Sequence, residues 1–219
     1  MNIYQHRIDK FIHQVSVYPV SCEKLANGRS DEQWLDAVLA GGARIVQLRD
    51  KESDDITVYE KARIFREKTR RAGALFIVNN RLDIALAVDA DGVHLGNTDL
   101  PAWEARRLAP DLIIGVSANT AEQAAAAKQS GANYFNIGPL YPTKTKQKLT
   151  KFLGPEAIAR FSALSDLPFT VMGGIKKDHI PEITAKGARR IAVVTALTKA
   201  DDITAETRNW VDFITQHTE

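Results

Sequence analysis

Cationic and amide side chains end one short apolar run of the sequence. The motif VQLRDK places Gln47, Arg49 and Lys51 at alternate positions. Because alternate residues of a β-strand point to the same side, these three side chains can share one face. A glutamine amide can hydrogen-bond a heterocycle, whereas arginine and lysine supply positive charge for a phosphate. Ordinary ion pairs at a solvated strand end are the alternative interpretation of this motif.

A second stretch combines hydroxyl groups and lysines on a loop shaped by glycine and proline. The sequence GPLYPTKTK carries Thr143 and Thr145, with Lys146 directly after them. Two hydroxyls and an ammonium group in this arrangement can hold an oxyanion. A solvated lysine loop would explain the lysines but not the Thr-x-Thr-Lys pattern. We therefore expect the loop to close over a pyrophosphate and to exclude water from it.

Two further loops offer backbone N–H groups instead of charge. The motif MGGI contains Gly173 and Gly174, and the motif VVTAL contains Val194 and Thr195. Backbone N–H groups in the last two loops of a barrel commonly bind phosphate, and glycine lets the backbone approach its oxygens closely. Together with the cationic motifs, these loops predict two anion sites, and so two phosphorylated ligands in one pocket.

The remaining candidates are amides, a hydroxyl, a carboxylate and a histidine. We expect Asn79 to contact a ligand and Ser117 a phosphate, with a helix cap and a turn as their respective structural alternatives. Asp99 is the candidate Mg²⁺ ligand, with an N-cap as its alternative role, and Asn80 is a weaker, neutral ligand. His94 stands between two apolar residues, and we expect it to make a structural hydrogen bond inside the fold. No pattern indicates an activated nucleophile for covalent catalysis.

The elements that position these residues form a regular alternation. Short apolar runs without strict polar alternation recur, as is typical of parallel strands buried on both faces, and an amphipathic stretch follows each. We expect strands at residues 15–20, 44–48, 75–78, 92–95, 112–116, 134–137, 169–172 and 191–194. We expect helices at residues 31–39, 55–71, 81–88, 103–108, 121–129, 154–164, 178–185 and 202–216.

Eight strand–helix units in about 205 residues predict an α/β fold of the (β/α)₈ TIM barrel type, with its chemistry at the C-terminal ends of the strands. A doubly wound open sheet is the alternative, but no GxGxxG motif follows the first strand. Residues 1–14 are expected to form an N-terminal extension, a short helix that closes the bottom of the barrel with Ile8, Phe11 and Ile12. Residues 15–219 are expected to form the catalytic barrel.

The composition limits the partners. Twenty-nine Lys and Arg residues against 27 Asp and Glu residues give a net charge of +2, which is not the strongly basic balance of a nucleic-acid-binding protein. The N-terminus lacks the apolar region of a signal peptide, and no apolar stretch approaches the roughly 18 residues of a membrane helix. The one cysteine, Cys22, agrees with a reducing compartment. We expect a cytoplasmic protein that acts on small molecules, without nucleic acid or membrane partners, and a homo-oligomer is left open.

Several motifs in order carry a resemblance. VQLRDK, VNNRLDIALAVDADGVHLGNTDLP, IGVSANT, YFNIGPLYPTKTK, MGGI and VVTAL resemble the thiamine-phosphate synthase family over roughly residues 44–202. The resemblance implies a (β/α)₈ barrel and a transferase that joins 4-amino-2-methyl-5-hydroxymethylpyrimidine pyrophosphate to a thiazole phosphate. It also implies Mg²⁺ as cofactor and a dissociative substitution, in which pyrophosphate leaves before the thiazole nitrogen attacks.

The resemblance also implies a role for each candidate residue. The pyrimidine pyrophosphate would be contacted by Gln47, Arg49, Lys51, Asn79, Ser117 and Lys146. The thiazole phosphate would be held by Thr143, Thr145, Gly174, Val194 and Thr195, beside Gly173. The departure of pyrophosphate would be assisted by Arg49, Lys51, Ser117 and Lys146.

The chain departs from the family pattern at the expected metal site. The family usually has Asn-Asp-Arg where this chain has Asn79, Asn80 and Arg81, so Asp99 is left as the carboxylate ligand. One alternative function is that of a thiazole tautomerase, an isomerase whose relatives lose the Thr-x-Thr-Lys loop and use a histidine near position 119. This chain keeps the loop and has Asn119. A non-catalytic protein that binds thiazole or thiamine phosphate is the other alternative, supported only by Asn80.

Overall fold

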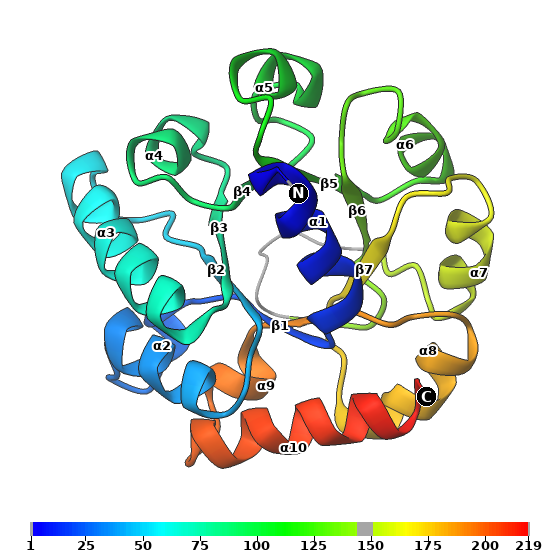
Figure 1. Cartoon of the computed structure of the whole chain (residues 1–219). Helices are drawn as coiled ribbons and strands as arrows, with labels where there is room; N and C mark the ends of the chain where they lie inside the picture. Colours follow the sequence, from blue (N-terminus) through cyan, green and yellow to red (C-terminus); the bar gives the residue numbers. More distant parts are fainter. Residues whose placement is uncertain (1, 144–150, 219) are drawn as a thin grey trace.

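The strands close into a parallel ring. The computed structural model describes residues 2–143 and 151–218, and in this part of the chain eight strands alternate with helices (Figure 1). They are β1 (Val17–Pro19), β2 (Ile45–Leu48), β3 (Leu75–Asn79), β4 (Gly92–Leu95), β5 (Ile113–Ala118), β6 (Tyr134–Ile137), β7 (Phe169–Met172) and β8 (Ile191–Val193). The hydrogen-bonded order is β1-β8-β7-β6-β5-β4-β3-β2, and a parallel bridge between Val20 and Gln47 joins the two ends. The predicted (β/α)₈ barrel is therefore confirmed.

Helices surround the ring of strands, apart from the N-terminal helix, which lies over its centre (Figure 1). They are α1 (Ile3–Gln14), α2 (Asp31–Ala40), α3 (Asp55–Ala72), α4 (Leu82–Ala87), α5 (Ala102–Leu108), α6 (Ala121–Ala126), α7 (Glu156–Ser162), α8 (Ile180–Ala185), α9 (Thr195–Thr198) and α10 (Ile203–Gln216). Ser30 and Thr120 begin α2 and α6 with capping boxes that Gln33 and Gln123 complete. Among the described residues, no helix is both long and apolar enough to cross a membrane.

Four elements differ from the sequence prediction. The first strand is only three residues long and begins at Val17, because Val15 is the C-cap of the preceding helix. The predicted helix at residues 178–185 begins as a 3-10 turn, η2 (Lys177–His179), since Pro181 fits only the first turn of an α-helix. A short additional helix, α9, directly follows β8. A second 3-10 turn, η1 (Glu23–Leu25), lies between β1 and α2.

Helix α1 lies across one opening of the ring (Figure 1). Its Phe11 is fully buried, and the Phe11 ring centroid is 4.6 Å from that of Tyr134 inside the barrel. Buried Arg190 donates from Nε to the Phe11 carbonyl at 2.9 Å and from Nη2 to the Ile12 carbonyl at 2.6 Å. Arg7 of α1 pairs with Asp91 at 3.0 Å. The N-terminal end of the barrel is thus filled and tied down, so ligands have access only at the other end.

The barrel interior is tightly packed around Tyr134. A Cβ atom at Gly115 would lie 2.1 Å from Cζ of Tyr134, so glycine at this position makes room for the ring. A second apolar layer fills the space between the strands and the outer helices. Its largest fully buried members are Trp34, Phe65, Phe76, Phe135, Phe161 and Trp210. The two layers make the strands a rigid support for the residues at their C-terminal ends.

Candidate active site

A cavity of about 700 Å³ opens at the C-terminal ends of the strands. All eight strands contribute to its wall, through Tyr18, Gln47, Asn79, His94, Ser117, Asn136, Thr170 and Ala192. The predicted site residues that line it are Gln47, Arg49, Lys51, Asn79, Asn80, Asp99, Ser117, Thr143, Gly173, Gly174, Val194 and Thr195. The structure thus brings together every predicted site residue that it describes. Thr145 and Lys146 lie outside the described residues.

The loop after β2 presents two cations to the cavity. Arg49 and Lys51 line it, whereas Asp50 between them turns away and bonds Lys61 at 2.7 Å. The backbone N–H of Arg49 donates to Ser21 Oγ at 3.1 Å, which holds this loop against the end of β1. Neither Arg49 nor Lys51 forms an ion pair with a carboxylate in the described part of the chain. Their charges are therefore available to an anionic ligand.

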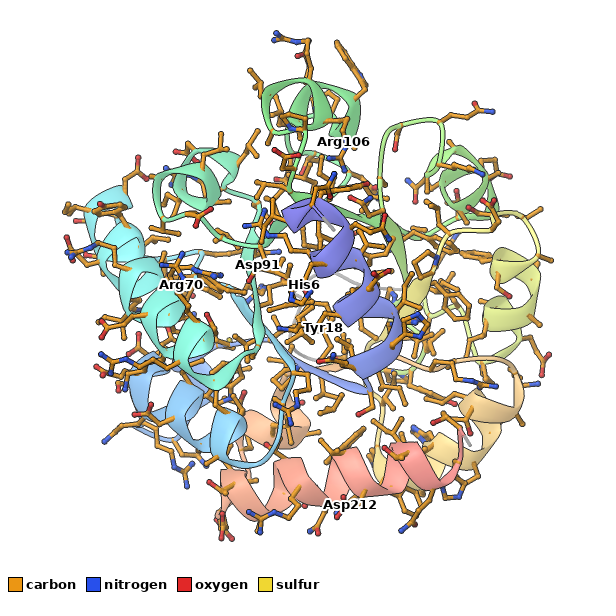
Figure 2. All side chains as sticks on the ribbon, in the orientation of Figure 1. His6, Tyr18, Arg70, Asp91, Arg106 and Asp212 are labelled. Carbon is orange, nitrogen blue, oxygen red and sulfur yellow. The ribbon has the colours of Figure 1, made fainter. Side chains whose placement is uncertain are left out.

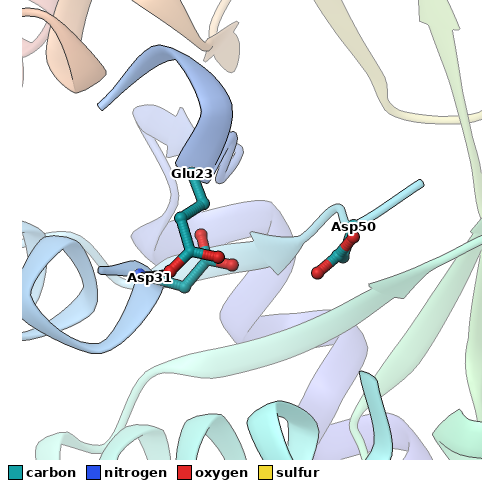
Figure 3. A group of neighbouring side chains, drawn as sticks. All are labelled: Glu23, Asp31 and Asp50. Carbon is teal, nitrogen blue, oxygen red and sulfur yellow. Dashed lines mark hydrogen bonds between the residues drawn. The ribbon is translucent and has the colours of Figure 1, made fainter. Parts of the chain in front are cut away.

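Three carboxylates behind this loop surround Lys61. Figure 3 shows Glu23, Asp31 and Asp50 gathered from η1, the start of α2 and the end of β2. Such a cluster has the composition of a metal site, but Lys61 Nζ lies 2.5 Å from Glu23, 3.2 Å from Asp31 and 2.7 Å from Asp50. The ammonium group stands where a metal ion would bind. We therefore interpret the cluster as an ionic anchor for the loop that carries Arg49 and Lys51.

Burial and charge act in opposite directions in this anchor. Burial disfavours the ionised form of Asp50, but hydrogen bonds from Lys61 and Ser53 outweigh it and hold the pKa of Asp50 well below its ordinary value. Burial raises the pKa of Asp31, and the attraction of Lys61 only partly offsets it. The pKa of Lys61 is raised because its hydrogen bonds to the carboxylates outweigh its burial.

Asp99 and Asn80 meet on the wall of the cavity. Asn80 has a left-handed backbone, with φ +67°, and its Nδ2 donates to Asp99 Oδ1 at 3.1 Å. The other carboxylate oxygen accepts from the backbone N–H of Gly96 at 2.6 Å. Both residues line the cavity, so the Asp99 carboxylate and the Asn80 amide oxygen are the groups available to a cation there. One carboxylate and one amide oxygen fit Mg²⁺, which keeps several waters and binds substrate phosphates with few protein ligands.

The loops after β7 and β8 form another sector of the rim. Gly174 has φ +64°, and a Cβ atom there would lie 2.4 Å from the carbonyl oxygen of Pro142. The loop after β6 thus packs directly on this glycine, which the sequence analysis had related only to phosphate binding. Lys176 and Lys199 also line the cavity beside these loops, although neither was selected from the sequence. Each lies a few residues beyond a predicted phosphate loop, and that position was the available signal.

Six side chains are hydrogen-bonded in series across the barrel. They are Asn79, Gln47, Tyr18, Tyr134, His94 and Ser117. Burial raises the pKa of both Tyr18 and Tyr134, so both phenols stay protonated. Figure 2 shows Tyr18 within the ring of strands, behind α1. Neither tyrosine could be selected from the sequence, because a tyrosine inside an apolar run resembles any other core residue.

Asn79 leaves one polar atom without a partner. Its Oδ1 is buried and accepts no hydrogen bond from the described residues, while its Nδ2 donates to Gln47 Oε1 at 3.0 Å. A buried acceptor without a donor costs roughly 1–3 kcal/mol. Since Asn79 lines the cavity, a ligand that donates a hydrogen bond there would remove this cost.

Replacement of the central lysine tests the ionic anchor. Lys61→Met should lower the free energy of unfolding by roughly 2–4 kcal/mol at neutral pH, because the carboxylates lose their cation. The matched control is Lys68→Met on the same helix, whose partners Glu32 and Asp36 are exposed, with an expected loss below about 1 kcal/mol. Urea unfolding measures both variants.

The pH dependence of this loss has a definite sign. The depressed pKa of Asp50 means that its contribution is present above the ordinary carboxyl pKa and is lost as the pH falls. The deficit of Lys61→Met should therefore be largest at about pH 7 and smaller at about pH 3, below the ordinary carboxyl pKa. A deficit equal to that of Lys68→Met, or independent of pH, would show that Lys61 is not the anchor of this loop.

Comparison with known proteins agrees with this geometry. A family model described as thiamine monophosphate synthase matches residues 17–197. The thiamine-phosphate synthase of Pelotomaculum thermopropionicum is 40% identical over 89% of this chain and 90% of its own length. That of Methanospirillum hungatei is 43% identical over 90% of this chain and 97% of its own.

A solved structure is similar as well. The thiamine phosphate pyrophosphorylase from Pyrococcus furiosus superposes with a TM-score of 0.86 at 33% identity, covering 94% of this chain and 98% of the other. The motifs, the fold and the family match agree, and the predicted resemblance is confirmed: the chain belongs to the thiamine monophosphate synthase family.

Proposed function

We propose that the cavity couples an aminopyrimidine pyrophosphate to a thiazole phosphate, giving thiamine phosphate and free pyrophosphate. The observation that carries this proposal is the distribution of cations around one cavity. Arg49 and Lys51 follow β2, whereas Lys176 and Lys199 follow β7 and β8. Asp99 is the only carboxylate among the described lining residues. A cavity with four cations, one carboxylate and two separate cationic sectors suits two phosphorylated substrates.

Asn79 is the proposed partner of the pyrimidine. Its unpartnered Oδ1 can accept a hydrogen bond from an exocyclic amino group, which an aminopyrimidine carries. Gln47 is 5% exposed and holds the Asn79 amide in orientation through a bond of 3.0 Å. This arrangement favours an aminopyrimidine over a pyrimidine with a carbonyl in that place, because two acceptors would then face each other.

The reaction needs positioning and charge stabilisation from the chain. The bond between the pyrimidine methylene carbon and the pyrophosphate oxygen breaks, and its electron pair leaves with pyrophosphate. The lone pair of the thiazole nitrogen then forms the new carbon–nitrogen bond to the resonance-stabilised cation. Arg49, Lys51 and the Ser117 hydroxyl would stabilise the charge on the departing pyrophosphate, with Lys146 joining them. Holding both substrates in one cavity makes the attack effectively unimolecular.

The thiazole phosphate is assigned to the other sector of the rim. Its proposed ligands are Thr143, Thr145, Gly173, Gly174, Val194 and Thr195. Lys176 and Lys199 would add charge to this set. Asp99 and Asn80 would hold Mg²⁺, which supplies positive charge to the pyrophosphate when bound. That the protein acts in the cytoplasm remains a prediction from the sequence.

The residue at position 119 argues against the tautomerase alternative. An isomerase of this kind needs a group that exchanges a proton, and an amide does not. The side chain of Asn119 instead donates to the Gly138 carbonyl at 2.5 Å and accepts from Asn97 Nδ2 at 2.8 Å. It connects the loops after β4, β5 and β6, which is a structural role.

A coupling assay tests the proposed function. The purified protein is mixed with the aminopyrimidine pyrophosphate, the thiazole phosphate and Mg²⁺, and thiamine phosphate is followed by mass spectrometry. We expect product in the presence of Mg²⁺ and none with EDTA. Isomerisation of the thiazole without coupling would support the tautomerase. Unchanged substrates together with binding of thiamine phosphate would support a non-catalytic binding protein.

The proposed metal site has its own test. Asn80→Asp should lower the Mg²⁺ concentration for half-maximal rate by about tenfold, because a second carboxylate joins Asp99. Asn136→Asp is the matched control, since Asn136 lines the same cavity from β6 and its Oδ1 accepts from Thr170, a hydrogen bond that an aspartate keeps. If the Mg²⁺ concentration for half-maximal rate shifts equally in both variants, the added negative charge acts through the electric field of the whole cavity. Asn80 would then be excluded as a ligand position.

A further inference from the structure

We propose that Tyr18, Tyr134 and His94 are positioning residues. They link the amides of Gln47 and Asn79 to the Ser117 hydroxyl through a chain of hydrogen bonds, in which each group donates to the next one in the same direction. The chemical roles of Asn79 and Ser117, at the two ends of this hydrogen-bond chain, rest on the proposed function. The hydrogen-bond chain itself rests on contacts within the protein. The chain runs from β3 through β2, β1, β6 and β4 to β5. Its first two steps and its last step join neighbouring strands, whereas the steps from β1 to β6 and from β6 to β4 cross the barrel interior.

The contacts are continuous. Asn79 Nδ2 donates to Gln47 Oε1 at 3.0 Å, and Gln47 Nε2 donates to the Tyr18 hydroxyl oxygen at 2.8 Å. The Tyr18 and Tyr134 hydroxyl oxygens are 3.2 Å apart. The Tyr134 hydroxyl lies 3.0 Å from His94 Nδ1, and His94 Nε2 lies 3.2 Å from Ser117 Oγ. Every step is 3.2 Å or shorter, and the Tyr18–Tyr134 step is long for a hydrogen bond between two hydroxyl groups.

The two amides determine the direction of the chain. Because Tyr18 accepts from Gln47, its single hydrogen donates to Tyr134, and the Tyr134 hydrogen donates to His94 Nδ1. A neutral histidine with an accepting Nδ1 carries its hydrogen on Nε2, which then donates to Ser117 Oγ. The Ser117 hydrogen is consequently left to donate into the cavity that Ser117 lines. The structure thus predicts the Nε2–H tautomer of His94.

Packing holds the middle of the chain in place. Tyr134 is fully buried, Tyr18 is 1% exposed and His94 is 8% exposed. The Phe11 and His94 rings lie 4.6 Å and 5.6 Å from the Tyr134 ring. The absence of a side chain at Gly115 leaves the space that the Tyr134 ring occupies. These constraints oppose rotation of the rings, so the orientation at one end of the chain is transmitted to the other.

The chain gives both ends a defined polarity. At one end, Asn79 Oδ1 remains an acceptor for an amino group of the pyrimidine. At the other end, the Ser117 hydroxyl remains a donor for an oxygen of the leaving pyrophosphate. Reversing the chain would require flipping the Gln47 and Asn79 amides, which would present a donor to the pyrimidine and an acceptor to the pyrophosphate. The same three buried residues therefore favour the correct substrate contacts at both ends.

A spectroscopic measurement tests the chain without any substrate. In protein labelled with ¹⁵N-histidine, two-bond ¹H–¹⁵N correlations show which ring nitrogen carries the hydrogen, and His94→Gln identifies the His94 signals. We expect Nε2–H for His94 in the wild type at neutral pH. Tyr134→Phe should populate the other tautomer, whereas the control Tyr4→Phe should not, since Tyr4 bonds Asn133 outside the chain. Nδ1–H in the wild type would overturn the proposal.

Kinetics test the link between the two ends. Tyr134→Phe should lower kcat by about 10- to 100-fold, with the KM of the thiazole phosphate within about twofold, because the thiazole sector is outside the chain. Ser117→Ala should cost less in the Tyr134→Phe background than in the wild type, since the orientation of the hydroxyl is already lost there. If Tyr134→Phe and Ser117→Ala lower kcat by independent factors that multiply in the double variant, the link between the two ends is overturned.

The two proposals fail in different ways. If the wild type makes no thiamine phosphate but His94 carries its hydrogen on Nε2 and responds to Tyr134→Phe, the proposed function is wrong and the chain stands. If product forms while His94 carries its hydrogen on Nδ1, the function stands and the chain is wrong.

Discussion

The seam between β1 and β2 is the contact on which the remaining structure depends. Seven strand pairs form the ladder. In the described part of the chain, the backbone closes the ring through the bridge from Val20 to Gln47 and the bond from Ser21 N to the Gln47 carbonyl at 2.9 Å. Ser21 Oγ then accepts from the Arg49 backbone N–H. The residues that close the barrel are thus the residues that place Gln47 and Arg49 at the cavity. Closure of the fold and assembly of the site are here the same set of hydrogen bonds.

The charge of the cavity also depends on how a few side chains are arranged. The net charge of +2 gives no overall attraction for anions, so binding depends on which cations are left unpaired. Along the loop after β2, alternation sends Asp50 to Lys61 and leaves Arg49 and Lys51 facing the cavity. The acidic cluster around Lys61 therefore supports the anion site from behind without reducing its charge. Because α1 fills the opposite opening, the charged and polar groups of the cavity are open to ligands at one face of the barrel.

The sequence was informative wherever function depends on position along one strand. Apolar runs predicted the strands, and the residues just after them, such as Arg49, Asn79 and Ser117, proved to line one cavity. Features that depend on contacts between distant segments were not predictable. The Tyr18–Tyr134 pair joins residues 116 positions apart, and the Lys61 anchor joins α3 to η1 and α2. Lys176 and Lys199 lie just beyond predicted phosphate loops, but only the folded structure shows that both line the cavity.

Equilibrium binding shows whether one cavity holds two anions in separate sectors. Isothermal titration with pyrophosphate and with thiamine phosphate, each in the presence of Mg²⁺, would be measured for the wild type, Arg49→Gln and Lys199→Gln. The account predicts that the wild type binds both ligands together. Arg49→Gln should weaken the binding of pyrophosphate by about tenfold or more and the binding of thiamine phosphate by less. Lys199→Gln should weaken the binding of thiamine phosphate more than that of pyrophosphate. Competition between the two ligands for one site, or equal weakening of both by each variant, would contradict it.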